Sequence, residues 1–207
     1  SPVCVGTSAV INSGLSASNY VFSSRAYAST TIPISASSLC TNGVSTVPLG
    51  GGTLDNGGWD NVPVGFSFNF FGNNYSSLAV STNGFLIFGP ILGYGTTSGQ
   101  LGQNVFSNLG GTFPNTNNPG NMIAVMAGDH YFGNETNGSA TGDIYYWTEG
   151  YAPNRRFVLY YKDVNACCSS SSPTFSARVV LYETLGLVDV FIDNNIQSGP
   201  NSVGDQN

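Results

Sequence analysis

The chain has 207 residues, of which only 8% are charged, and 5 Lys and Arg against 11 Asp and Glu give a formal net charge of −6. So few scattered cations cannot neutralise a row of phosphates, which excludes nucleic-acid binding, and no apolar run approaches the roughly 20 residues that cross a bilayer. The 27 Gly and 10 Pro argue against long helices, while 41% hydrophobic residues can bury a core, so the composition indicates an acidic all-β protein.

The first part of the chain, residues 1–45, is predicted to be an N-terminal arm or the end of a preceding module. Residues 1–45 are rich in Ser, Thr and Ala, and their short β-prone pieces predict one or two loose strands. These pieces are residues 10–11, 20–22 and 31–34. We expect residues 46–207 to form the main module.

The clearest strand covers residues 64–70. Phe66, Phe68 and Phe70 alternate with small or polar residues, which places three rings on one face of a sheet. Residues 78–80 and 85–88 predict two further strands. The Asn83-Gly84 pair between them favours a type I′ hairpin, in which both central residues have positive φ.

The second half of the chain predicts more strands, separated by polar loops. Residues 122–127 are apolar on both faces and predict a central strand, flanked by polar loops at residues 89–121 and 129–141. Four more strands follow, the last two joined by a hairpin. They cover residues 143–147, 156–162, 175–182 and 187–192. This spacing of short strands predicts an antiparallel β-sandwich, jelly-roll-like in its architecture.

The cysteines point to an oxidising, extracellular setting. Their even number, four, in a lysine-poor chain fits disulfide bonding. We favour the pairing of Cys4 with Cys40, which flank one self-contained segment, and of Cys167 with Cys168. The alternative ties Cys4 and Cys40 each to one member of the adjacent pair. The favoured pairing would staple the N-terminal arm.

A polar loop carries the oxygen ligands that calcium takes. Asp129, Glu135 and Asp143 bracket this loop, which also contains asparagines and several backbone carbonyls. The set does not follow EF-hand spacing, so the alternative is that these residues only form turns. The three carboxylates predict a calcium site, and turn formation alone is the alternative.

Aromatic rings placed outside the predicted core could stack on sugars. Three such rings are expected in loops: Trp59 beside Asp60, Tyr94 between two glycines, and Tyr131 beside Phe132. Carbohydrate sites combine such rings with polar side chains that bond hydroxyl groups. The alternative is that each ring packs beneath its own loop.

Enzymatic motifs are missing from the sequence. The chain has no nucleophile elbow, P-loop, zinc-protease motif or dinucleotide fingerprint. The single histidine, His130, lies in a polar loop, and the acidic residues are spread thinly. We expect no catalytic residues and no enzymatic activity.

Several segments resemble, in order, the motifs of nidogen-like β-sandwich modules, especially those of large secreted adhesins and gliding-motility surface proteins of Bacteroidota. The most distinctive are residues 65–72, which read GFSFNFFG, and residues 80–89, which read VSTNGFLIFG. The later matching segments are residues 123–129, 142–146, 154–164, 175–183 and 203–207. The last resembles the start of a longer final segment, so we expect the module to be truncated at its C-terminus.

The resemblance implies a non-catalytic module of a cell-surface adhesin, secreted and associated with the outer membrane. Such a module would serve surface attachment or gliding motility, and its partners would be an extracellular surface or polysaccharide and neighbouring modules of the same chain. The absence of a leader at Ser1 fits excision from a larger precursor. The alternative function is a specific carbohydrate-binding module, for which calcium dependence is left open.

Overall fold

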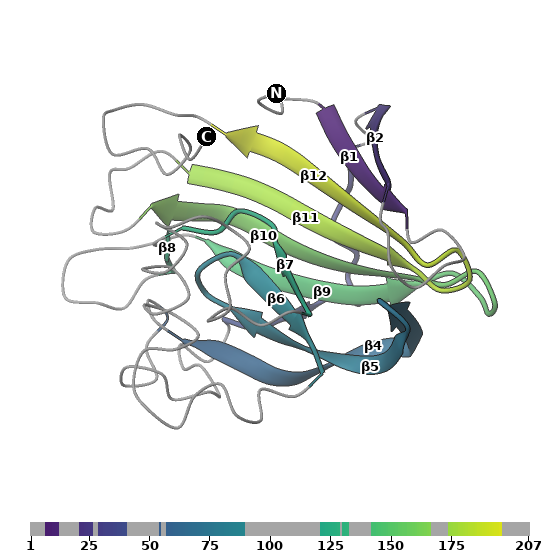
Figure 1. Cartoon of the computed structure of the whole chain (residues 1–207). Coiled ribbons are helices and arrows are strands. Elements are labelled where there is room, and N and C mark those ends of the chain that lie inside the picture. The colour runs from purple at the N-terminus through teal and green to yellow at the C-terminus, as the bar shows by residue number, and fades with distance from the viewer. Residues whose placement is uncertain are drawn as a thin grey trace.

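The computed structural model describes residues 7–12, 21–26, 29–40, 54, 57–89, 121–128, 130–132, 142–166 and 174–195. The regular elements in this part of the chain are all β-strands, and every pairing between them is antiparallel. They form two sheets, drawn one above the other in Figure 1. This described part contains no helix that is long and apolar enough to span a membrane.

The larger sheet has eight strands in the described residues, seven of them in the order β2-β1-β12-β11-β10-β9-β3, and β8 pairs with β10. Their bounds are β1 Thr7–Asn12, β2 Val21–Ala26, β3 Ser37–Ser38, β8 His130–Tyr131, β9 Asp143–Glu149, β10 Arg156–Ala166, β11 Thr174–Tyr182 and β12 Leu187–Asn195. The four strands predicted for the C-terminal half are confirmed as β9 to β12, and β11 and β12 form the predicted hairpin.

The smaller sheet has the order β4-β5-β6-β7 in the described residues. Its strands are β4 Gly58–Phe70, β5 Asn73–Ser81, β6 Phe85–Phe88 and β7 Met122–Ala124. The predicted alternation in β4 is confirmed, because Phe66, Phe68 and Phe70 are buried whereas the residues between them are exposed. Phe88 on β6 stacks on Phe70, with ring centroids 4.1 Å apart.

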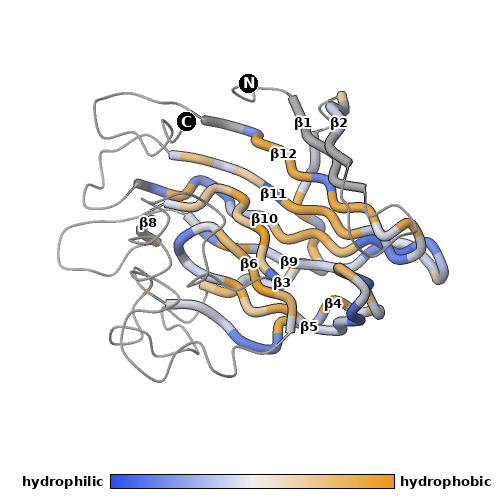
Figure 2. Tube along the Cα trace, in the orientation of Figure 1, coloured by the Kyte–Doolittle hydropathy of each residue, from blue (hydrophilic) through white to orange (hydrophobic). Residues whose placement is uncertain are grey.

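The main hydrophobic core lies between the two sheets. It joins residues of β4, β5 and β6 to alternate residues of β9, β10, β11 and β12, such as Phe157, Leu159 and Val179. Figure 2 shows the hydrophobic residues concentrated along the strands of both sheets and the hydrophilic ones at the turns. Two antiparallel sheets packed on one core confirm the predicted all-β sandwich.

Two local predictions are wrong. The apolar run at residues 122–127 is not a central strand, because β7 ends at Ala124 and is the last strand of its sheet within the described residues. The following residues, Val125 and Met126, instead donate their backbone N–H groups to the carbonyl oxygen of Gly84. The turn between β5 and β6 is not type I′ either. It contains the three residues 82–84, and only Gly84 has positive φ, as in three-residue hairpins.

The N-terminal arm contributes strands to the larger sheet. β1 pairs with β12 and β2 extends the same edge, while β3 pairs with β9 at the opposite edge. Residues 31–34, a predicted strand piece, are not in a strand. The domain boundary between residues 45 and 46 stays a prediction.

Candidate functional site

Of the three residues predicted to bind sugar, the structure describes Trp59 and the backbone of Tyr131. Trp59 lies in β4, opposite Val80 of β5, and is only 4% exposed within the core. Its predicted loop position is therefore wrong, and the ring has no exposed face for a sugar. Tyr131 lies in β8, where it pairs with Asn165 of β10, and Tyr94 lies outside the described residues.

Of the three predicted calcium ligands, only Asp143 lies within the described residues; Asp129 and Glu135 do not. The Asp143 carboxylate accepts hydrogen bonds from the Ser38 hydroxyl at 2.6 Å, the Ile144 N–H at 2.7 Å and the Cys40 N–H at 3.2 Å. These bonds fasten the segment around β3 to the start of β9. The described residues contain no group of three or more His, Cys, Asp and Glu that could hold a metal ion, and the calcium site stays a prediction.

Cys40 has a free, half-buried thiol in the structure. Burial, and then the charge of Asp143, raise the pKa of this thiol far above its usual value. A thiol held in its protonated form is a poor nucleophile. Both predicted pairings use Cys40, whose thiol is free in the structure. Because Cys4, Cys167 and Cys168 lie outside the described residues, the pairing itself stays a prediction.

The larger sheet has a second hydrophobic cluster, on the face turned away from the sandwich core. This outer cluster consists of Trp147, Val158, Tyr160, Val180 and Phe191. The chain leaves β2 at one edge of the sheet and enters β3 at the other, and the described residues between them lie on this face. We call residues 29–36 the strap; its Ile32 and Ala36 pack against the outer cluster.

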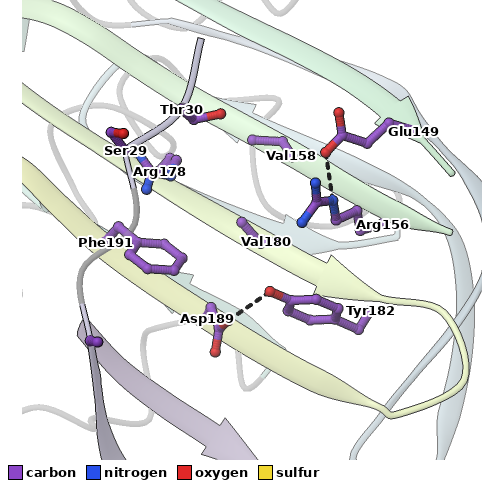
Figure 3. Close-up of a pocket in the computed structure, with 11 residues that line it drawn as sticks. Ser29, Thr30, Glu149, Arg156, Val158, Arg178, Val180, Tyr182, Asp189 and Phe191 are labelled. Atoms are coloured by element: carbon purple, nitrogen blue, oxygen red, sulfur yellow. Dashed lines mark hydrogen bonds and ion pairs between the residues drawn. The ribbon is translucent and has the colours of Figure 1, made fainter. Parts of the chain in front are cut away.

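A groove of about 220 Å³ opens between the start of the strap and the outer face of the larger sheet, as shown in Figure 3. Ser29 and Thr30 of the strap line one side. The floor and the other sides come from β9 to β12, whose side chains fall into cross-strand rows. These lining residues are Glu149, Arg156, Val158, Arg178, Val180, Tyr182, Asp189 and Phe191.

The charged residues of the groove are paired with one another or with neighbours. The Arg156 guanidinium lies 2.5 Å from the Glu149 carboxylate, and both side chains are partly exposed at the rim. Arg178 is almost fully buried, binds both carboxylate oxygens of Asp193 at 2.7 Å, and lies over the Phe191 ring.

At the floor, Tyr182 donates its hydroxyl proton to the buried Asp189 carboxylate at 2.8 Å, as Figure 3 shows. The hydrogen bond stabilises the buried carboxylate. It also holds the Tyr182 ring in one orientation. The groove therefore combines an apolar floor with polar groups held in fixed positions.

The sequence analysis missed this groove, although two signals for it are present. Residues 156–161 and 177–182 are apolar at almost every position, which indicates strands covered on both faces. Arg178 and Asp189 interrupt this pattern inside strands, where a charge needs a partner. Which segment covers the second face depends on the path of the N-terminal arm, which no local pattern reveals.

Residues 81–84 form a fully buried turn with a structural role. Thr82 exchanges backbone and hydroxyl hydrogen bonds with Gly57. The Asn83 side-chain oxygen accepts from the backbone N–H of His130 at 3.0 Å. The Tyr161 hydroxyl, from the larger sheet, lies 3.0 Å from the carbonyl oxygens that flank the turn. The turn thus connects both sheets to the segment that leads into β8.

A second cluster with a structural role joins the two sheets. It is built around Arg155, just before β10, and Glu183, just after β11. Arg155 donates three hydrogen bonds to the Glu183 carboxylate, two from its side chain and one from its backbone. A further guanidinium N–H donates to the carbonyl oxygen of Gly65 in β4 at 2.7 Å. The same guanidinium lies 5.6 Å from the centroid of the Phe66 ring. Residues from three of the motifs quoted above therefore meet at one point and hold the sandwich together.

Comparison with known families gives one match. The NIDO-related family model matches residues 19–206. No curated protein and no solved structure matches the chain. Because the family match covers nearly all of the sequence, this nidogen-like β-sandwich belongs to the NIDO-related family.

Proposed function

We propose that this chain is a non-catalytic adhesion module of a large secreted protein displayed on the cell surface. Membership of the NIDO-related family supports the assignment to a nidogen-like module. The motif resemblance to Bacteroidota adhesins supports attachment to an outer surface or gliding motility as its setting. The partners would be an extracellular surface or polysaccharide and the neighbouring modules of the parent protein.

The observation that carries this proposal is the groove on the outer face of the larger sheet. Glu149 is paired with Arg156, Arg178 with Asp193, and Asp189 with Tyr182. General acid–base catalysis needs a group that can exchange a proton with the substrate, whereas ligand binding needs groups held in fixed orientations. This arrangement supports binding rather than catalysis.

The composition of the chain favours adhesion through many weak contacts rather than one strong contact. With only 8% charged residues, the chain has few groups for long-range electrostatic attraction. A single small groove gives modest affinity, but many copies on one surface gain avidity through effective concentration. Adhesion should therefore depend steeply on the density of the module.

The test is attachment of beads that carry the 207-residue chain at high or low density, under flow, to glass and to polysaccharide films. We expect firm attachment only at high density. Beads that carry an unrelated β-sandwich of the same net charge are the control. Equal attachment of both bead types would contradict an adhesive function.

The alternative function is a calcium-dependent carbohydrate-binding module, and one observation favours it. β8 and β9 lie along the same edge of β10, where Tyr131 pairs with Asn165 and Asp143 pairs with Lys162. The backbone of a predicted sugar-binding residue and that of a predicted calcium ligand are thus brought to one end of the sheet. Calorimetric titration with calcium, followed by sugar titration with and without chelator, tests this alternative. Sugar binding that is unchanged by chelator would exclude calcium dependence.

A further inference from the structure

We infer that the groove beneath the strap binds one neutral sugar residue, such as the terminal ring of a glycan chain. This inference rests on the proposed function, because it names the ligand through which the module would attach. It differs from the predicted loop site in every residue, since the groove is built from Ala26 at the end of β2, from the strap and from β9 to β12.

The size of the groove suits a single sugar ring. Its volume of about 220 Å³ lies below the roughly 300 to 1,000 Å³ of pockets that hold drug-sized molecules. Val158, Val180 and Phe191 form an apolar floor that suits the C–H face of a sugar. Ser29 and Thr30 place hydroxyl groups at the opposite side.

The accessible charges of the groove balance each other. At the rim, Glu149 and Arg156 are both partly exposed and are paired with each other. Arg178 and Asp193 form a second pair that is almost fully buried, and the remaining carboxylate, that of Asp189, is fully buried. An ionic ligand would therefore meet only the rim pair and would have to compete with one member of that pair for the other, which is costly in a partly buried site. The groove favours a ligand without net charge.

Hydroxyl groups suit the rim because they can bond both members of an ion pair at once. Each hydroxyl donates one hydrogen bond and accepts up to two. At the rim, Arg156 uses its Nε to bind Glu149, and its side chain is 54% exposed. A guanidinium has five N–H donors and a carboxylate about four acceptor positions, so a sugar hydroxyl can bond both without breaking the pair.

The test is a protein NMR titration of the 207-residue chain with neutral monosaccharides, a uronic acid, an amino sugar and a free amino acid. We expect a neutral sugar to give saturable shifts in the amide signals of the strap and of β10 to β12. Thr30→Val removes one hydroxyl from the groove and should weaken binding about fivefold, the effect of one hydrogen bond. Thr31→Val is the matched control, because Thr31 is the next strap residue and does not line the groove.

Three results would overturn the inference: no shifts in the groove with any neutral sugar, preferred binding of the uronic acid, amino sugar or amino acid, or equal affinities of the two threonine variants. Both variants should keep the wild-type melting temperature, so that a loss of folding is not mistaken for a loss of binding. Bead attachment separates the two proposals. Beads that attach although no sugar binds would contradict only the sugar site, whereas sugar binding without attachment would contradict only the adhesive function.

Discussion

Gly84 occupies a position that no other residue fits. Its φ is +78°, and a Cβ atom there would overlap the backbone carbonyl group of Met126. The same glycine's carbonyl oxygen accepts two backbone hydrogen bonds from the segment after β7, so the turn cannot shift without breaking them. We predict that Gly84→Ala lowers the free energy of unfolding by about 3 kcal/mol, measured by urea denaturation.

Gly150→Ala is the matched control for this substitution. Gly150 also has positive φ, +85°, but it is exposed and a Cβ atom would lie 3.1 Å from the nearest atom, the carbonyl oxygen of Asn154. The strained backbone alone should cost about 1 kcal/mol. Equal losses for the two variants would contradict the role of the buried contact at Gly84.

His130 should remain neutral in the folded protein at mildly acidic pH. It is 3% exposed, and its Nε2–H donates to the Met126 carbonyl oxygen. Burial lowers its pKa from the ordinary value of 6.5, because the charged form loses its hydration. In the unfolded chain the imidazole binds a proton below that pH, so stability should fall as the pH drops, by up to about 1.4 kcal/mol per pH unit.

The measurement is simple because His130 is the single histidine of the chain. Its imidazole NMR signals should stay unchanged between pH 7.5 and 6, while urea unfolding shows the loss of stability below pH 6.5. His130→Gln keeps a donor for Met126 and should remove this pH dependence. A signal that titrates with its midpoint near 6.5 would show that the ring is not held neutral.

Single residues also show where sequence reasoning succeeds. The alternation of Phe66, Phe68 and Phe70 is local and is confirmed, because a two-residue period is a property of the strand itself. The loop position predicted for Trp59 is wrong because the start of its strand is set by a non-local pairing. Nothing in its neighbours shows that β4 begins at Gly58, since that start depends on pairing with Val80 and Ser81.

Among the elements, the strap should contribute to stability through one side chain in particular. Ile32 is partly buried against the outer cluster, whereas Ile34 is fully exposed. We predict that Ile32→Ser lowers the free energy of unfolding by about 1 to 2 kcal/mol, because apolar area is returned to water. Ile34→Ser should have almost no effect, and urea denaturation of both variants checks the difference. Similar losses at the two positions would mean that the strap does not rest on the sheet through Ile32.

Elements were predictable where a strand's pattern is self-contained. β9 to β12 were found because each alternates or is flanked by clear turns. β7 was misplaced because an apolar run predicts burial on both sides but does not distinguish a short edge strand from a central one. The groove was missed because its walls combine the strap with β9 to β12. These four strands lie more than a hundred residues after the strap in the sequence.

At the scale of the whole molecule, the larger sheet is covered on both faces. The smaller sheet covers the inner face, and the strap covers part of the outer one. The sequence analysis divided the chain into an arm, residues 1–45, and a module, residues 46–207. The structure places three strands of that arm in the larger sheet, on both of its edges.

A fragment of residues 46–207 should therefore be much less stable than the whole chain. It lacks β1, β2, β3 and the strap, so it exposes the outer cluster and leaves the edges of β9 and β12 without partners. Exposed apolar area and unpaired strand edges both favour association. We predict a free energy of unfolding lower by about 3 kcal/mol or more, together with binding of a hydrophobic dye and aggregation that depends on concentration. Removing residues 1–3 is the matched control, because it keeps Cys4 and leaves every described strand in place. If the fragment were monomeric and as stable as the whole chain, residues 1–45 would not be needed for folding. Their role would then be to form the groove.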